Sequence, residues 1–380
     1  MGLSELDFIE ALRKIATHPA ARGLADDAAV LGDLVLTHDS IAEGVHFLPD
    51  DPPASVGWKL VAVNLSDLAA KGAEPLAALM SVTIAGDGAW EKGFLSGVAA
   101  ACETYGLPLV GGDTIALPAG APRVLGLTAI GRGGSHIPAR CGGKPGDRLW
   151  LIETLGDAAA GLAILQADRR AEGVLVEAYR RPVPLLAAGR RLAPLAHAMM
   201  DVSDGLLLDL SRLCSASGCG ATVDLDALPL TRAFIAERGQ DRAARLFAAT
   251  GGDDYALLAA CAPDLDPGLS LCLPVGAMVT AIGHLTDGGG ICLSDAAGEV
   301  PLPERLGYEH HHRAATAPLA DCDARARIGD GRRGAPQRRI GKASAQSGLP
   351  ALISPLNLFH TSSAWQARLP NAPRSTGEIH

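Results

Sequence analysis

The order of apolar and polar residues predicts helices and strands that alternate along most of the chain. Residues 4–16 place apolar side chains at helical spacing, and residues 55–71 form a longer apolar helix, with Ser55 as its N-cap and Gly72 just past its end. Short apolar runs predict strands at residues 34–37, 77–84, 108–110, 124–130, 148–152, 253–260 and 278–284, and further helical patterns lie at 90–105, 158–166, 184–197 and 204–217. This alternation in both halves indicates a mixed α/β, or α+β, protein.

A polar, glycine-rich stretch at residues 131–146 separates the two halves and is typical of a domain boundary. We therefore predict an N-terminal domain at residues 1–135 and a C-terminal α/β domain at residues 146–312. Residues 313–380 show no sustained period and are rich in Pro, Gly, Ser and Arg. We expect that segment to be a basic, disordered tail.

The charge of the chain is uneven. The formal net charge is −9, but residues 313–380 have a net charge of +6, which leaves −15 on residues 1–312. An acidic body argues against nucleic acid as the main partner, and it allows a carboxylate-rich site that works through divalent cations.

The composition indicates a folded protein that works in a reducing compartment. Hydrophobic residues make up 48% of the chain and charged residues 20%, so a sizeable core is expected. No apolar run approaches the roughly 18 residues that a membrane span needs. The first residues are acidic and amphipathic, unlike a secretory signal, and the eight cysteines include no C-x-x-C pair. We expect a cytoplasmic protein without a membrane partner.

Several aspartates lie alone in apolar or glycine-rich surroundings. They are Asp26, Asp27, Asp39, Asp67, Asp113, Asp201 and Asp204. A buried carboxylate is costly unless it is paired, hydrogen-bonded or bound to a metal. Mg²⁺ prefers oxygen ligands and commonly bridges a few carboxylates to phosphate oxygens. Taken together, these positions predict a site for several Mg²⁺ ions that would suit a nucleoside triphosphate.

Each aspartate also has a purely structural interpretation. Asp201 or Asp204 could cap a helix N-terminus, Asp67 could pair with Lys71 one turn further on, and Asp113 could cap a turn. For any single position this interpretation is the simpler one, and the metal hypothesis rests on the whole set.

The glycine motifs favour anion binding but exclude two common nucleotide folds. Gly111-Gly112 would let backbone amides approach an anion closely. The chain has neither a Walker A motif nor a Gly-x-Gly-x-x-Gly motif after a strand, so a P-loop NTPase and a dinucleotide-binding fold are disfavoured. Arg140, in the boundary stretch, is either a phosphate contact or a solvated side chain.

Eight short motifs occur in a fixed order along the body. They are Asp26-Asp27-Ala-Ala-Val, Thr37-His-Asp-Ser-Ile-Ala-Glu-Gly-Val-His46, Asn64-Leu-Ser-Asp67-Leu-Ala-Ala-Lys-Gly, Gly111-Gly-Asp-Thr114, Arg140-Cys-Gly-Gly-Lys, Met200-Asp-Val-Ser-Asp-Gly, Gly251-Gly-Asp-Asp-Tyr255 and Gly307-Tyr-Glu-His310. Each motif is weak alone. The ordered set resembles the thiamine-monophosphate kinase family, within the superfamily of aminoimidazole ribonucleotide synthetase, over about residues 4–310.

The resemblance implies a two-domain fold in which the N-terminal domains of two chains join their sheets into a β-barrel, and hence a homodimer. It implies an enzyme that uses ATP and Mg²⁺ to phosphorylate thiamine phosphate to thiamine diphosphate, the last step of thiamine diphosphate biosynthesis. The implied metal positions are Asp26, Thr37, His38, Asp39, Asp67, Asp113, Asp201 and Asp204. The implied ATP positions are Gly112, Asp113, Arg140 and Ser203, and the implied thiamine phosphate positions are His46, Asp253 and Tyr308.

Two residues depart from the family pattern. Where His38 stands the family usually has Thr or another small residue, and this ligand can act through its backbone. Where Asp253 stands the family usually has Glu, so the shorter acid would weaken the contact with the aminopyrimidine of the substrate.

The implied acceptor is a phosphate monoester with a second pKa of about 6, so it is already ionised near neutral pH and needs no general base. We therefore expect direct in-line transfer without a phosphoenzyme, and we assign no catalytic acid or base. The alternatives are another ATP-using enzyme of the superfamily and a catalytically inactive nucleotide-binding protein. Selenophosphate synthetase needs a reactive Cys or selenocysteine in an N-terminal glycine-rich loop, and residues 18–27 contain none.

Overall fold

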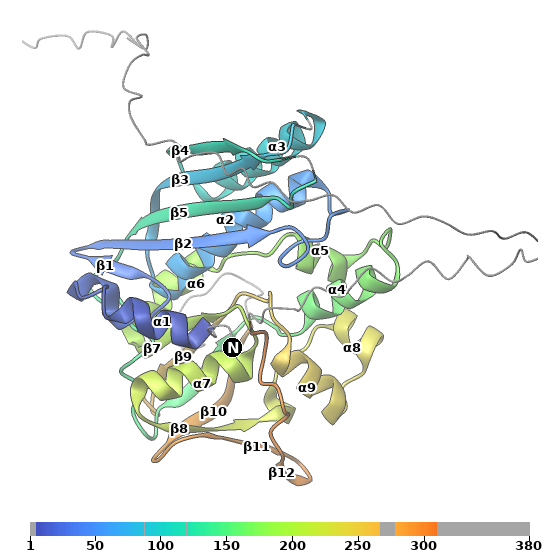
Figure 1. Cartoon of the computed structure of the whole chain (residues 1–380). Helices are drawn as coiled ribbons and strands as arrows, with labels where there is room; N and C mark the ends of the chain where they lie inside the picture. Colours follow the sequence, from blue (N-terminus) through green and yellow to red (C-terminus); the bar gives the residue numbers. More distant parts are fainter. Residues whose placement is uncertain (1–4, 87, 119, 267–277, 310–380) are drawn as a thin grey trace, which may run out of the picture. The chain divides into compact units, whose positions relative to one another are not determined.

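The computed structural model describes residues 5–86, 88–118, 120–266 and 278–309 (Figure 1). The predicted tail at residues 313–380 and the motif residue His310 lie outside this range. The first sheet has five strands in the order β1-β2-β5-β3-β4. Their bounds are β1 Ala29–Leu31, β2 Leu34–Ala42, β3 Glu74–Ile84, β4 Leu109–Ala116 and β5 Val124–Arg132.

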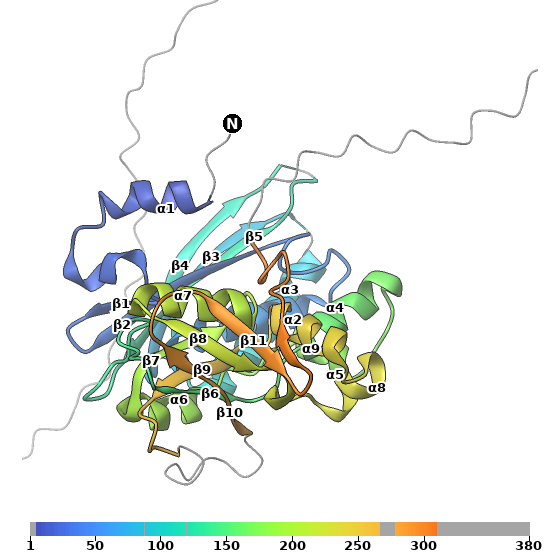
Figure 2. The same cartoon turned by 90° about the horizontal axis from the view of Figure 1, so that it is seen from below.

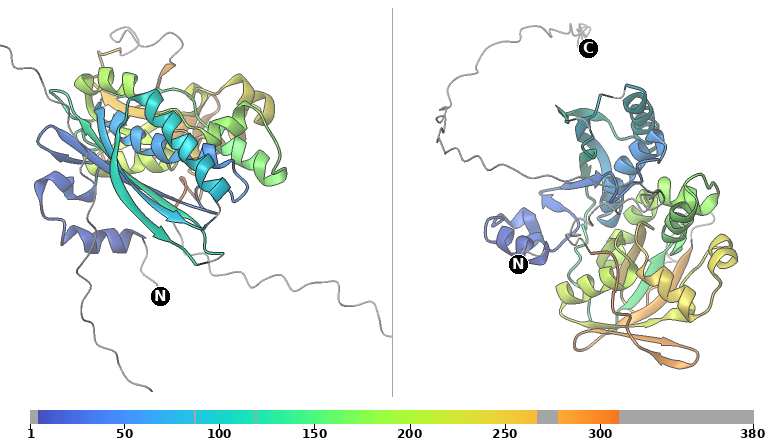
Figure 3. Two further views of the ribbon diagram at one scale, coloured as in Figure 1. Left: turned by 90° about the horizontal axis from the view of Figure 1, so that it is seen from above. Right: turned by 45° about the vertical axis from the view of Figure 1, so that its right-hand side comes forward.

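The first sheet is antiparallel except at its β4 edge, where β4 runs parallel to β3. This parallel pair needs a crossover, which is supplied by α3 (Gly88–Tyr105). Helix α2 (Pro53–Ala70) lies beside α3 on the same face of the sheet (Figure 3). Side chains such as Leu60, Phe94 and Leu127 fill the space between the helices and the sheet and are almost fully buried.

Glycines allow α2 and α3 to approach each other closely. A Cβ atom on Gly97 would lie 1.9 Å from the carbonyl oxygen of Ala54, and one on Gly57 would lie 2.2 Å from that of Phe94. Glycine in a helix interior costs stability relative to alanine, so these positions are explained by the packing and not by helix propensity.

The second sheet has seven strands in the order β12-β11-β8-β10-β6-β9-β7, and α7 lies close to β7 and β8 (Figure 2). Its strands are β6 Arg148–Ile152, β7 Ala196–Val202, β8 Gly220–Asp224, β9 Ala256–Cys261, β10 Val279–Thr286, β11 Ile291–Asp295 and β12 Gly298–Val300. The remaining helices are α1 Glu5–Arg13, α4 Asp157–Ala167, α5 Val174–Arg180, α6 Leu186–Leu192, α7 Leu206–Ser217, α8 Arg232–Arg238 and α9 Arg242–Thr250. A second apolar core, which includes Leu151, Leu210 and Leu258, lies against this sheet.

Most elements expected from the sequence are present, and two details were wrong. Ser55 is not an N-cap, because α2 already begins at Pro53 and its cap position, Pro52, makes no side-chain cap bond. The helix expected over residues 184–197 ends at Leu192, and after a short 3₁₀ turn the chain continues as the strand β7. In the described ranges, no helix has both the length and the hydropathy needed to cross a bilayer.

Candidate functional site

Helix α2 carries several polar side chains of the candidate site, although almost all of it is buried. It packs on β2 and β5 of the first sheet and also contacts β7 and α6, so it has no solvent-facing side that could hold its polar residues. Lys59, Asn64, Ser66, Asp67 and Lys71 are all buried. Polar groups in such a position must find partners within the protein.

Three carboxylates meet where β2, α2 and β7 come together. The Thr37 hydroxyl donates a hydrogen bond to Asp67, and the Ser66 hydroxyl donates one to Asp201 at 2.5 Å. Asp39 follows Thr37 on β2 at the spacing that returns a side chain to the same face of a sheet. These carboxylates come from three elements that are far apart in the sequence.

Burial and mutual repulsion oppose the ionisation of these three carboxylates. Burial raises the pKa of Asp67 well above its usual value, and the negative charges of Asp39 and Asp201 raise it further. Burial likewise raises the pKa of Asp39, and it raises that of Asp201 to about 8. Among the residues that the structure describes, no Lys or Arg side chain pairs with any of the three. The group is therefore suited to a bound cation.

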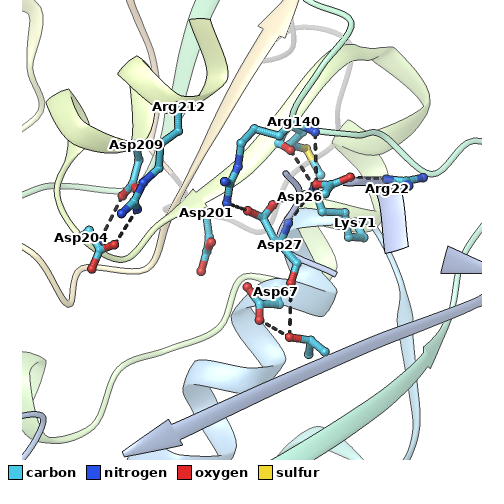
Figure 4. A network of polar contacts seen from close by, with 12 residues as sticks. Arg22, Asp26, Asp27, Asp67, Lys71, Arg140, Asp201, Asp204, Asp209 and Arg212 are labelled. Carbon is cyan, nitrogen blue, oxygen red and sulfur yellow. Dashed lines mark hydrogen bonds and ion pairs between the residues drawn. The ribbon is translucent and has the colours of Figure 1, made fainter. Parts of the chain in front are cut away.

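Asp26 and Asp27 have a different environment, because cations surround them (Figure 4). Lys71 contacts both carboxylates, and Arg140 donates to Asp27. Burial opposes the ionisation of Asp27, but the attraction of Lys71 and Arg140 outweighs it and lowers the pKa of Asp27. The suggestion that Lys71 pairs with Asp67 was wrong, since its ammonium contacts the other two aspartates.

A third acidic group lies at the start of α7. Arg212 donates to Asp204 at 2.5 Å and to Asp209 at 2.8 Å. Burial, and then the charge of Asp204, raises the pKa of Asp209 to about 7. The structure does not bear out an N-cap role for Asp201 or Asp204, because the cap position of α7 is Gly205, with no side-chain cap bond.

A cavity of about 300 Å³ adjoins these carboxylates. Its lining includes Asp39, His46, Ser203, Asp204, Asp253 and Tyr308. The backbone of Asp253 has a φ of +70°, which is unusual for a residue with a side chain. Lys59 donates both to Asp253 at 2.9 Å and to the carbonyl oxygen of His46 at 3.0 Å. The buried ammonium of Lys59 thus connects two residues of the cavity lining, His46 and Asp253.

Comparison with known proteins places the chain in a family. Residues 25–132 match the model of the AIR synthase related protein, N-terminal domain, and residues 144–296 match that of the C-terminal domain. A thiamine-monophosphate kinase of Escherichia coli (strain K12) is 37% identical over 303 residues, which cover 76% of this chain and 91% of that protein. The chain belongs to the thiamine-monophosphate kinase family. This confirms the family, and the two-domain AIR synthase-like mixed α/β fold, that the ordered motifs led us to expect.

Solved structures of the thiamine-monophosphate kinase family share the fold. The enzyme from Stenotrophomonas maltophilia K279a is 35% identical, with a TM-score of 0.64, and the match covers 77% of this chain and 97% of that one. The structure of AaThiL complexed with AMPPCP and TMP is 29% identical, with a TM-score of 0.71, and the match covers 82% of this chain and 99% of that one.

Not every residue expected from the family motifs lies near the others. Gly112 and Asp113 are on β4, the outer strand, and β5 and β3 separate them from β2. A Cβ atom on Gly112 would lie 1.9 Å from the carbonyl oxygen of Met80, so strand packing alone requires glycine there. His38 is exposed, and its ring bonds to Thr128 at 2.9 Å, on the opposite face of β2 from Asp39.

Sequence reasoning named Lys71 and Arg140 but missed two other cations and one acid of this site. Lys59, Asp209 and Arg212 were not singled out, although Lys59 and Asp209 each stand alone in an apolar helix. That is the same signal that drew attention to Asp67. A search for isolated basic residues as well as isolated acidic residues in apolar helices would have found Lys59 and Asp209.

The donor set fits a hard divalent cation, although no ligand shell is preformed. Within residues 5–86, 88–118, 120–266 and 278–309, no group of three or more His, Cys, Asp or Glu side chains is arranged to hold a metal ion by itself. Mg²⁺ needs no such shell, because it usually keeps several waters and binds one or two carboxylates together with substrate phosphates. Buried carboxylates that lack a cationic partner are the feature that favours it.

Proposed function

We propose that this chain transfers the γ-phosphate of ATP to thiamine phosphate and so forms thiamine diphosphate. One observation supports this most directly. The cavity lined by His46, Asp253 and Tyr308 is also lined by Asp39, one of the three carboxylates that no described Lys or Arg pairs with. An acceptor in this cavity would therefore lie next to the place where a cation is favoured.

The proposed roles follow the family pattern. Asp26, Thr37, Asp39, Asp67, Asp113, Asp201 and Asp204, with the backbone of His38, would hold several Mg²⁺ ions. Gly112, Asp113, Arg140 and Ser203 would contact ATP. When bound, Mg²⁺ would supply positive charge that reduces the repulsion between the two anionic phosphates.

The residues of the chain would mainly position the reactants. His46, Asp253 and Tyr308 would orient the thiamine phosphate, and the buried Lys59 would keep two of these residues in place. Because the acceptor phosphate is already ionised, no side chain needs to remove a proton, and transfer would be direct and without a phosphoenzyme.

We further propose a homodimer that pairs along the edge strand β4 into a barrel. Every residue of β4 is exposed, and Val110 is 63% exposed. An exposed apolar edge strand is a ready template for pairing with another chain. In such a dimer, Gly112 and Asp113 would serve the nucleotide site of the partner, which would account for their separation from Asp39.

We keep residues 1–135 and 146–312 as the proposed domains, and we propose that the protein is cytoplasmic. In the described part of the chain, Cys102, Cys141, Cys214, Cys219, Cys261 and Cys292 are all free thiols. Free thiols are typical of reducing compartments.

The test is chromatographic detection of thiamine diphosphate after incubation of the purified chain with thiamine phosphate and ATP, with and without Mg²⁺. We expect Mg²⁺-dependent product with stoichiometric ADP, and no label on the protein when γ-³²P-ATP is used. A folded protein that binds ATP but forms no product would refute the proposal. A chemically stable ³²P-protein that transfers its label to thiamine phosphate would refute direct transfer.

A further inference from the structure

Tyr255 connects the two sheets of the molecule. It lies directly before β9 of the second sheet, and its backbone N–H bonds to the carbonyl oxygen of Val202 at 2.9 Å, at the end of β7. Its side chain belongs instead to the apolar core of the first sheet, where the other buried members that the structure describes lie between Ala28 and Ala129. Tyr255 is only 7% exposed, so close packing holds its ring in place.

The backbone around Tyr255 forms a turn that is held by bonds on both sides. Asp253 has a φ of +70° and Tyr255 a φ of +53°, in the left-handed region that residues with side chains rarely adopt. The N–H of Asp253 bonds to the carbonyl oxygen of Ser203 at 2.8 Å. The carboxylate of Asp254 accepts from two backbone N–H groups at the start of α4, at 2.6 and 3.2 Å. These bonds account for a backbone conformation that would otherwise be unfavourable.

Both carboxylate oxygens of Asp253 accept hydrogen bonds from buried side chains. The Tyr255 hydroxyl donates to Oδ1 at 3.1 Å, and the Lys59 ammonium donates to Oδ2 at 2.9 Å. Because hydrogen bonds are directional, one donor on each oxygen fixes the rotation of the carboxylate. An ionised carboxylate offers about four lone-pair sites, so about two remain for a ligand. The Asp253 side chain is 26% exposed, which leaves room for a ligand to reach it.

Asp253 and Tyr255 lie between two cavities. Both residues line the cavity proposed for thiamine phosphate, here called the acceptor cavity, which Asp39 also lines. Both residues also line a neighbouring cavity of about 350 Å³, whose lining includes Glu153 and Arg181. The rotation of the Asp253 carboxylate therefore decides which cavity its free lone pairs face, and the Tyr255 hydroxyl is one of the two groups that fix this rotation.

We propose that Tyr255 is a positioning residue for the acceptor: its hydroxyl, together with the Lys59 ammonium, holds the Asp253 carboxylate toward the acceptor cavity and away from the neighbouring one. This rests on the proposed function and deepens it, because it names the group that orients Asp253 before the acceptor binds. A binding group that is already oriented lowers the entropic cost of binding. Since Tyr255 acts through Asp253, its hydroxyl should affect the affinity for the acceptor and not the rate of transfer in the full complex.

The test measures binding without turnover. Titration calorimetry gives the Kd of the full chain for thiamine phosphate in the presence of Mg²⁺ and AMPPCP, an ATP analogue whose methylene bridge blocks transfer of the γ-phosphate. Tyr255→Phe keeps the ring in the core and removes only the hydroxyl. We expect the Kd for thiamine phosphate to rise about tenfold, because a hydrogen bond to a charged group typically contributes at least about that factor. The Kd for AMPPCP should stay unchanged.

Tyr105→Phe is the matched control. The Tyr105 ring also packs against the core of the first sheet, with its centre 5.6 Å from that of Trp58, and Tyr105 lies outside the linings of both cavities. Y105F should therefore leave the Kd for thiamine phosphate unchanged.

A double-mutant cycle with Asp253→Ala separates an indirect role from a direct one. If the Tyr255 hydroxyl acts through the carboxylate, Y255F should cause no further loss of affinity once Asp253 is replaced. A hydroxyl that contacted thiamine phosphate itself would still cause its full loss in the D253A background.

Steady-state kinetics of the same variants give a second readout. In Y255F the KM for thiamine phosphate should rise by the same factor as the Kd, while kcat stays at the wild-type value. A smaller fraction of folded protein would instead lower kcat and leave the KM unchanged, so the two effects can be told apart.

An unchanged Kd for thiamine phosphate in a folded Y255F would overturn the proposal and leave the proposed function standing. The same holds for equal losses from Y255F with and without Asp253. A Y255F chain that does not fold would also overturn it, since the hydroxyl would then support the fold and not the site. A wild-type chain that binds AMPPCP but not thiamine phosphate would overturn both this proposal and the proposed function.

Discussion

Replacing Lys59 with Met should weaken both the fold and the binding of thiamine phosphate. The Lys59 side chain is 2% exposed, and its ammonium bonds to Asp253, bonds to the carbonyl oxygen of His46 and lies 4.0 Å from the centre of the Tyr179 ring. The substitution would leave Asp253 without its cationic partner and would release the backbone at His46.

The magnitude follows from the burial of the two partners. Removing one partner of a buried ion pair costs about 3–5 kcal/mol, because the other charge is left uncompensated. The Asp253 side chain is 26% exposed, so water can solvate part of the orphaned carboxylate. We therefore expect a loss of about 2–3 kcal/mol in the free energy of unfolding, below the range for a fully buried pair.

The assays are urea unfolding and the KM for thiamine phosphate. We expect the KM to rise at least about tenfold, which corresponds to about 1.4 kcal/mol of lost binding. A double-mutant cycle with Asp253→Asn should give a coupling of about 2 kcal/mol in stability. Lys92→Met, on the exposed surface of α3, is the control and should change stability by less than about 0.5 kcal/mol.

Two results would refute this reasoning. The first is a cycle whose single effects simply add, because the Lys59–Asp253 pair would then contribute nothing of its own. The second is an unchanged KM in K59M, which would mean that His46 and Asp253 keep their positions without the ammonium.

Three further predictions concern packing, assembly and pH. Gly97→Ala should destabilise the protein by roughly 1–3 kcal/mol, because its Cβ would meet Ala54, whereas Gly88→Ala, in open space, should change the urea midpoint little. Val110→Glu should convert the proposed dimer into monomers in sedimentation equilibrium. Burial raises the pKa of Asp254 to about 8, so the native protein keeps a proton that the unfolded chain loses near pH 4. The unfolding free energy should therefore fall as pH rises from about 4 to about 8, and Asp254→Asn should flatten this part of the profile in urea titrations.

Local periodicity predicted those elements whose pattern is unambiguous. The helix expected over residues 90–105 is α3, and the strand expected over residues 148–152 coincides with β6. Strand β7 was missed, because it is buried along nearly its whole length and follows directly on a helix, so its apolar run extends the helical pattern without an alternation to mark the change.

The sequence predicted several residues of the candidate site, but it did not predict which of them form ion pairs with one another. Isolated aspartates in apolar segments pointed to Asp67 and Asp201, and the structure brings them together. Sequence distance favoured Asp67, four residues away, as the partner of Lys71, whereas the fold brings Asp26 and Asp27 to it from a loop before the first sheet. Only tertiary packing decides between a partner one helical turn away and one more than forty residues away.

Helix α2 sets the distance between two buried lysines of the candidate site, Lys59 and Lys71. Lys59 lies within α2 and Lys71 is the C-cap residue that follows its last turn, twelve positions further on, which places them about 18 Å apart along the helix axis at 1.5 Å per residue. Lys59 contacts Asp253 at the acceptor cavity, and Lys71 contacts the Asp26–Asp27 pair. The length of the helix therefore sets the distance between these two parts of the site. Inserting a single residue between them would turn one end by about 100° relative to the other and move both ammonium groups out of register. The segment between Lys59 and Lys71 can therefore tolerate substitutions but not insertions or deletions, whereas the surface loops of the same chain can tolerate all three.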